Sequence, residues 1–287
     1  MTDQSKPTPI DVARASDLTE EAIAASLGER PARTFVAVIS CDAEAMRWAR
    51  GDAPDGAVVA AQYMMGLRDR GGVPWPVDAE TGLAFSLITH PKIPPIRSGR
   101  LYLAGVSALL DTIPDAGRID WPDSITTEDG TLLAGMVDRV SSGVAGIEWA
   151  ITTFYVVHFD GDRAALMGEL VRTFDEHWSR PDAELVGYYK ERCRTMGRRV
   201  RATFLPLGPR ARKVDGEAVE ITAGGGLIVV VEGDKKVTLQ INDIGKLEYF
   251  GEDGTIESSD PLASAAALAF WPLAGDVAPP SDAGWTP

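Results

Sequence analysis

The fold is decided by the stretch Arg118-Ile119-Asp120-Trp121-Pro122-Asp123-Ser124, which is followed by Leu132-Leu133-Ala134-Gly135-Met136-Val137. Proline fixes φ and lacks an N–H donor, so Pro122 marks the end of a strand rather than its middle. An acidic loop, Glu128-Asp129-Gly130, then leads back into an apolar strand. A glycine inside such a strand indicates that another backbone or a ligand comes close, and Gly135 has that position. The stretch therefore predicts two neighbouring strands joined by a hairpin.

Strands and helices alternate on both sides of this stretch until the pattern changes near residue 205. Apolar residues at helical spacing predict a helix over 101–113. Short strands with Gly and Asp turns after residue 216 are typical of a small all-β barrel. The predicted strands are 34–39, 57–62, 83–88, 148–157, 200–204, 217–222, 227–231, 236–241 and 247–250, and the predicted helices are 22–27, 43–50, 101–113, 163–178, 183–196 and 263–270.

Composition excludes several classes of protein. The 287 residues carry a formal charge of −14, which argues against general nucleic-acid binding because that binding neutralises phosphates. No apolar run approaches the ~18 residues that a membrane span needs, and residues 1–9 lack the apolar core of a signal peptide. Two distant cysteines and three histidines form no disulfide framework and no metal-ligand spacing. We expect a cytoplasmic protein with no nucleic-acid partner, no membrane association and no metal site.

Four features in this order resemble the biotin/lipoate protein ligase superfamily, over about residues 34–245. They are a serine turn after the first strand (Ser40-Cys41-Asp42), a Gly/Arg loop (Gly66-Leu67-Arg68-Asp69-Arg70-Gly71-Gly72), the Trp-Pro-Asp and Leu-Ala-Gly pair, and the run from Tyr188 to Val200. The resemblance implies an α+β fold. It consists of a mixed β-sheet with helices on one side, as in class II synthetase-like ligases, plus a small C-terminal SH3-like β-barrel.

The domain organisation that follows has four parts. Residues 1–33 form an N-terminal extension with a short helix, and residues 34–206 form the ligase-like catalytic-type domain. Residues 207–252 form the SH3-like domain, and 253–287 form a C-terminal tail.

The resemblance implies a two-step acyl transfer. A small carboxylic acid attacks ATP, with Mg, to give an acyl-adenylate, and a lysine of a biotin/lipoyl-carrier or acyl-carrier domain then takes the acyl group. Carboxylate and phosphate repel each other, so such a site needs fixed cations and N–H donors where charge develops.

The residues of this chain depart from that pattern where charge matters most. The lysine that ligases carry before Trp-Pro is Asp120, and the lysine before Leu-Ala-Gly is Leu132. At ~4 Å and an effective dielectric near 20, the lost attraction and the new repulsion are each about 4 kcal/mol. Because each ~1.4 kcal/mol is tenfold in rate, ordinary adenylation would be slowed by orders of magnitude. The alternative is a non-catalytic relative that binds a ligand or a protein, so enzymatic activity stays open.

The candidate site residues follow from the resemblance. The catalytic candidates are Arg68, Arg70 and Asp120, and the ligand-binding candidates are Ser40, Cys41, Gln62, Gly66, Gly71, Gly72, Trp75, Trp121 and Gly135. Each has a simpler interpretation: the Gly/Arg loop as a surface turn, Asp120 and Asp123 as turn residues beside proline, and the tryptophans as core. Cys41 is either an acyl-transfer nucleophile or a small buried residue.

Overall fold

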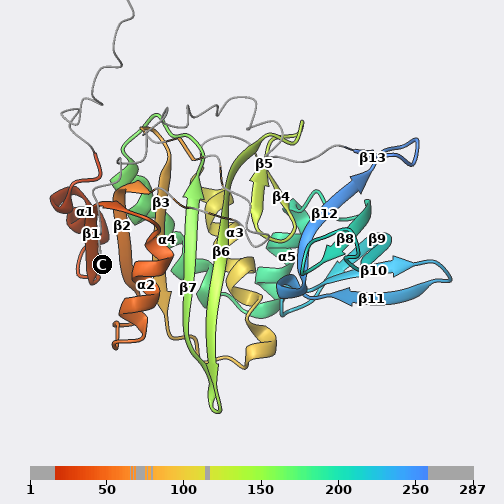
Figure 1. The fold of residues 1–287 in the computed structure, drawn as a ribbon, viewed down its shortest axis with the longest axis horizontal. Helices are drawn as coiled ribbons and strands as arrows, with labels where there is room; N and C mark the ends of the chain where they lie inside the picture. The colour runs from red at the N-terminus through yellow and green to blue at the C-terminus, as the bar shows by residue number, and fades with distance from the viewer. Residues whose placement is uncertain are drawn as a thin grey trace, which may run out of the picture.

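The first part of the chain folds into a mixed sheet, shown in Figure 1. The computed structural model describes residues 17–64, 66, 68, 75, 77–78, 80–113 and 117–257. Within these residues the sheet has seven strands: β1 (Ala32–Val38), β2 (Ala57–Met64), β3 (Leu83–Thr89), β4 (Arg118–Asp120), β5 (Ser124–Thr126), β6 (Leu132–Gly143) and β7 (Gly146–Val156). Their order is β1-β2-β3-β7-β6-β5-β4. Strands β1 and β2 are parallel and the other neighbours are antiparallel.

The stretch around the Trp-Pro turn forms three strands rather than the predicted two, because β5 lies between β4 and β6. Strand β4 ends at Asp120, the chain turns through Trp121 and Pro122, and β5 returns antiparallel to β4. Strand β6 then pairs with β5, with Ser124 opposite Gly135.

Helices cover both faces of the sheet. Helices α1 (Glu20–Leu27), α3 (Arg100–Thr112) and α4 (Arg163–Ser179) pack on the face that carries Phe85 and Phe154. Helix α2 (Cys41–Ala49) packs on the opposite face, against Val59, Ile88 and Ile151. The prediction of helices on one side is therefore wrong for α2. Its Ala- and Cys-rich apolar stripe fits closely onto alternate residues of β2, β3 and β7, which point away from α4.

Helix α5 (Asp182–Arg192) is shorter than the helix predicted over 183–196. Beyond Arg192 the backbone pairs with β4, because Arg194 N donates to Ile119 O at 2.9 Å. This long-range hydrogen bond replaces the next helical turn, so the tertiary contact overrides a sequence that favours helix.

A second sheet follows α5 and stands beside the first (Figure 1). In the described part of the chain it has six antiparallel strands in the order β11-β10-β9-β8-β12-β13. Their bounds are β8 (Arg199–Phe204), β9 (Lys213–Ile221), β10 (Leu227–Val231), β11 (Lys235–Leu239), β12 (Ile244–Phe250) and β13 (Ile256–Glu257). The first strand of this sheet lies within the range predicted for the first domain. Closure into an SH3-like barrel and the exact domain limits stay predictions.

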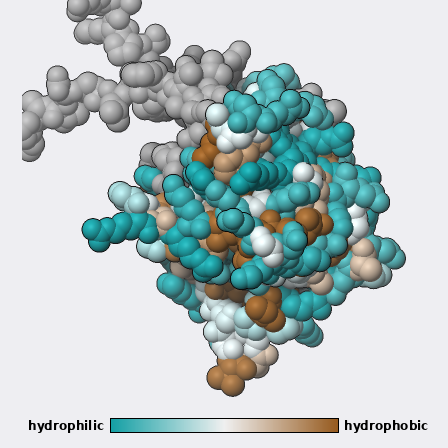
Figure 2. Space-filling model, turned by 90° about the vertical axis from the view of Figure 1, so that its right-hand side faces the viewer, coloured by the Kyte–Doolittle hydropathy of each residue, from teal (hydrophilic) through white to brown (hydrophobic). Residues whose placement is uncertain are grey.

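One buried apolar cluster joins the two sheets. It runs from Phe85 and Phe154 through Tyr189 on α5 to Val200 and Leu239 of the second sheet. The face seen from the side of the second sheet is largely hydrophilic with a few hydrophobic side chains, as Figure 2 shows. Among the described residues, no helix combines the length and the apolar character that crossing a bilayer requires.

Candidate functional site: a pocket at the start of helix α2

A small pocket lies beside the turn between the end of β1 and the start of α2. Ser40 caps the helix, since its hydroxyl accepts a hydrogen bond from Ala43 N at 3.3 Å and donates one to Asp42. Gly66 is held beside this turn because its N–H donates to Ile39 O at 2.7 Å. The cavity is about 250 Å³ in volume, and its described lining is Ser40, Asp42, Ala43, Met46, Gly66, Arg68, Val137 and Arg139.

Two arginines and one carboxylate are the charged groups of this lining. Arg139 reaches in from β6 and forms an ion pair with Asp42 on α2. Arg68 comes from the predicted Gly/Arg loop. Two guanidinium groups and one carboxylate leave a single net positive formal charge among the described lining residues.

Arg139 was missed by the sequence analysis, although a signal was present. Side chains alternate along a strand, so residues two apart lie on one face. Gly135 was a candidate ligand-binding residue, and Val137 and Arg139 follow it at that spacing on β6. The same alternation therefore selects Arg139.

Cys41 lies beneath the pocket and is fully buried. Its thiol belongs to an apolar cluster with Val38, Ala45 and Ile88, and its backbone N–H points at Met64 Sδ, 3.3 Å away. Burial, with the nearby Asp42 and Glu44 carboxylates, raises the pKa of Cys41 to about 12. The thiol stays protonated at neutral pH, which favours the structural interpretation of this residue over nucleophilic catalysis.

Gly135, Trp75 and Tyr155 meet on the same face of the sheet. The Trp75 and Tyr155 rings lie 3.8 Å apart between centroids. A Cβ on Gly135 would overlap the Tyr155 hydroxyl and would lie 2.8 Å from Asp123 O. The close backbone approach predicted at Gly135 is therefore present, with the backbone of Asp123.

Asp120 and Trp121 lie at the contact between the two sheets. Asp120 accepts hydrogen bonds from Tyr249 Oη at 2.6 Å and Thr126 Oγ1 at 2.9 Å, and Arg194 Nε lies 3.1 Å away. Burial raises the pKa of Asp120, although these partners act to lower it. Trp121 donates from its indole to Gly225 O at 2.8 Å and from its backbone N to Thr195 Oγ1 at 3.0 Å.

We call this set of contacts the junction: Asp120, Trp121, Thr195, Gly225 and Tyr249. None of its members lines the α2 pocket. The structure thus brings Ser40, Gly66 and Arg68 together, and places Asp120 and Trp121 in a separate environment.

Of the other candidates, one lies on β2 and three lie outside the described residues. Gln62 is half-buried on β2 and is absent from the described lining of the pocket. Arg70, Gly71 and Gly72 lie outside the described residues. Among the described residues, no group of three His, Cys, Asp or Glu side chains is arranged to hold a metal ion.

No protein-family model matches the chain, and no curated protein matches it in sequence. Solved structures do match. The biotin protein ligase from Aquifex aeolicus in complex with biotin and ATP has a TM-score of 0.60 at 17% identity, covering 76% of this chain and 99% of that chain.

Two further solved structures are similar to this chain in fold. The biotin acetyl coenzyme A carboxylase synthetase from Helicobacter pylori with bound biotinylated ATP has a TM-score of 0.54 at 14% identity, covering 73% of this chain and 100% of that one. A biotin protein ligase-like protein of unknown function from Silicibacter sp. has a TM-score of 0.51 at 14% identity, covering 72% and 94%. At these identities the likeness concerns the fold. This chain has the fold of the biotin protein ligases, as its sequence resemblance predicts.

Proposed function

We propose that this protein binds a small carboxylic acid, as its monoanion, in the pocket at the start of α2. The observation that carries the proposal is that two guanidinium groups, those of Arg68 and Arg139, line one small cavity at the start of a helix. A guanidinium attracts a carboxylate and can hold it through two parallel hydrogen bonds. The positive end of the α2 dipole lies at the same turn and also favours an anion.

The size and walls of the pocket suit a small acyl chain. Its volume of about 250 Å³ lies below the ~300–1,000 Å³ typical of pockets for drug-sized ligands. Met46 and Val137 supply apolar surface beside the charged groups. An acid with a short apolar body would place its carboxylate at the arginines and its chain against these side chains.

ATP and Mg fit the described residues less well than the acid. A triphosphate is larger and more highly charged than a small monoanionic acid, and the described cavity has a volume of only about 250 Å³. No carboxylate cluster suited to Mg occurs in the part of the chain that the structure describes. We therefore assign the residues to acid binding alone and derive no step through the nucleotide.

Acyl transfer to a lysine of a biotin/lipoyl-carrier or acyl-carrier domain is the wider form of this proposal. Its support is the shared fold with ligases whose structures hold biotin and ATP or biotinylated ATP. The competing function is a non-catalytic binding module. The observation that favours it is Asp120, whose carboxylate is engaged by Arg194 and Tyr249 at the position where similar ligases carry lysine.

Calorimetric titration tests acid binding. Biotin, lipoate and octanoate are compared with octanamide, which keeps the chain and lacks the charge. At least one acid should bind, and at least tenfold more tightly than the amide. Absence of binding by every acid, or equal binding of octanoate and octanamide, would contradict the proposal.

Two variants of the Asp42–Arg139 pair should change affinity in opposite directions. Arg139→Gln removes a charged donor worth about 1.5–3 kcal/mol, so the affinity for the acid should fall about 10- to 150-fold. Asp42→Asn removes the competing carboxylate, so acid affinity should rise. Arg47→Gln, an exposed arginine on the same helix, is the matched control and should leave affinity unchanged.

Pyrophosphate release with ATP separates the two functions. Turnover with an acid that binds would support the ligase. Acid binding without turnover, together with no calorimetric signal for ATP, would support the non-catalytic module.

A further inference from the structure

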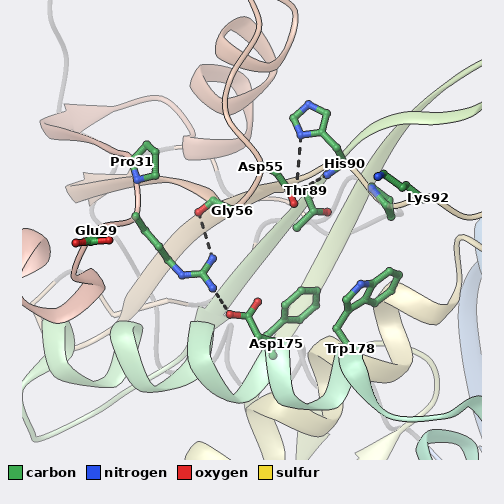
Figure 3. Close-up of a pocket in the computed structure, with 12 residues that line it drawn as sticks. Glu29, Pro31, Asp55, Gly56, Thr89, His90, Lys92, Asp175 and Trp178 are labelled. Atoms are coloured by element: carbon green, nitrogen blue, oxygen red, sulfur yellow. Dashed lines mark hydrogen bonds and ion pairs between the residues drawn. The ribbon is translucent and has the colours of Figure 1, made fainter.

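A second cavity lies on the α4 side of the first sheet, away from the α2 pocket. It has a volume of about 700 Å³, within the usual range for small-molecule sites. Figure 3 shows its walls. They come from the turn after α1 (Glu29, Arg30, Pro31), the segment before β2 (Asp55 and Gly56), the last residue of β3 and the segment after it (Thr89 to Lys92), and α4 (Phe174, Asp175 and Trp178). No described residue lines both cavities.

Carboxylates outnumber cations in this lining. Glu29, Asp55 and Asp175 carry three negative charges, and Arg30 and Lys92 carry two positive ones. Arg30 is already engaged, since it pairs with Asp175 and donates to Gly56 O at 3.4 Å. The uncompensated charge is therefore negative.

Asp55 and Asp175 face the cavity from different elements (Figure 3). Asp55 is fixed because its carboxylate accepts a hydrogen bond from His90 N at 2.7 Å. Burial raises the pKa of Asp175, and the charges of Asp55 and Glu176 raise it further, against the effect of Arg30. The two carboxylates repel each other, and a cation between them would relieve that repulsion.

Apolar and hydrogen-bonding groups complete the wall. The Phe174 and Trp178 rings stack with centroids 6.2 Å apart and planes inclined by 9°. The Thr89 hydroxyl oxygen is buried and has no hydrogen-bond partner among the described residues. An N–H group placed there would satisfy it, since a hydroxyl oxygen can accept.

We infer that this cavity binds a small organic cation, a primary amine whose ammonium lies between Asp55 and Asp175 and whose apolar body contacts the half-buried Trp178 ring. The carboxylates favour the cation. The Trp178 ring, which stacks on the buried Phe174, favours an apolar body. The inference does not depend on acid binding in the α2 pocket.

Calorimetric titration with three matched probes tests it. The probes are 2-phenylethylamine, 2-phenylethanol and 3-phenylpropanoate, which share the aromatic body and differ in charge. The amine should bind at least tenfold more tightly than the alcohol, and the acid should not compete for this cavity. Equal binding of amine and alcohol, or no binding of the amine, would overturn the inference.

Variants locate the site. Asp175→Asn should lower the affinity for the amine at least tenfold. Asp175→Asn also breaks the ion pair with Arg30 and could disturb folding, so Asp55→Asn is tested as a second variant. The Asp55 side chain is largely exposed, so Asp55→Asn should fold normally and should also lose affinity for the amine. Asp160→Asn, at an exposed carboxylate outside the cavity, is the control. Unchanged amine binding in both folded cavity variants would exclude this site.

Discussion

At the scale of single residues, the environment of Asp120 explains how a carboxylate is accommodated where the sequence resemblance predicts a lysine. The repulsion expected from the sequence assumed that this side chain faces a bound anion. Instead its oxygens accept hydrogen bonds from Tyr249 and Thr126 beside the Arg194 guanidinium. The Asp120 carboxylate therefore bonds to Tyr249 of the second sheet and to Arg194, and it helps to hold the two sheets together.

Asp120→Lys should not restore a ligase-like site but should destabilise the protein. The new ammonium would face Arg194, and Tyr249 would lose its acceptor. Breaking a buried charge pair costs about 3–5 kcal/mol, and we expect a loss of that order in urea unfolding. Glu128→Lys, at an exposed position of the same hairpin, should change stability by no more than about 0.5 kcal/mol. Wild-type stability of Asp120→Lys would refute the role assigned to the junction.

At the scale of elements, the start of α3 and the turn between β9 and β10 are in backbone contact. A Cβ on Gly99 would overlap Gly224 O and would lie 3.0 Å from Ile241 Cδ1. The second sheet can approach α3 this closely because neither glycine has a side chain. The glycine run at Gly224 to Gly226 therefore acts as a docking turn as well as a hairpin.

Gly99→Ala and Gly187→Ala should change stability in opposite directions. In Gly99→Ala the turn must move, at a cost of about 1–3 kcal/mol by analogy with overpacked cores. Gly187 lies within α5, and a Cβ there meets nothing within 4 Å. Alanine favours helix, so Gly187→Ala should stabilise by about 0.5–1 kcal/mol. Thermal and urea unfolding of both variants measure the difference, and equal effects would contradict it.

Asp111 connects three helices through its carboxylate. His177 Nε2 on α4 lies 2.8 Å from Asp111 Oδ2, and the Tyr188 hydroxyl on α5 donates to Oδ1. Burial acts to raise the pKa of Asp111, but these hydrogen bonds hold it below the ordinary value of 3.8. The unfolded chain therefore takes up this proton more readily than the folded protein does.

The stability that Asp111 contributes should be fully present at a pH above its pKa in the unfolded chain. It should be lost as the pH falls through its lower pKa in the folded protein. Asp111→Asn should be less stable than wild type at neutral pH, with the difference narrowing below pH 3.8. Urea unfolding across this range measures it. Glu191→Gln, at an exposed carboxylate on α5, is the control, and a difference independent of pH would argue against the linkage.

At the scale of the whole molecule, the two sheets share one buried core. The cluster that contains Phe85 and Phe154 continues through Tyr189 and Cys193 into Val200. The junction adds buried hydrogen bonds across the same boundary, including Trp121 to Gly225 and Tyr249 to Asp120. Neither sheet can lose its packing without exposing apolar surface of the other.

Unfolding should therefore be a single cooperative transition. Near-ultraviolet signals report on tryptophans such as Trp121 at the junction, and far-ultraviolet circular dichroism reports on both sheets. Their urea midpoints should coincide, as two-state behaviour requires. Two separated transitions would show that the second sheet unfolds independently.

Much of the fold could be predicted because its signals are local. Spacing of apolar residues predicted a helix over 101–113, and α3 spans Arg100–Thr112. Pro122 predicted the turn after β4, and Gly135 predicted a close approach of another backbone to β6. The site was harder to predict. Ser40, Gly66 and Arg68 were identified by resemblance, whereas Arg139 was missed although it lies on the same face of β6 as the candidate Gly135.

By itself, the sequence determined the order and type of most of the described elements, because periodicity and turn chemistry act between residues a few positions apart. Only the tertiary structure decided that α2 covers the opposite face, that α5 ends at Arg192, and that Asp120 points to Tyr249. Asp120 and Tyr249 are 129 positions apart along the chain. Contacts over such a separation depend on how whole layers pack, which no local pattern encodes.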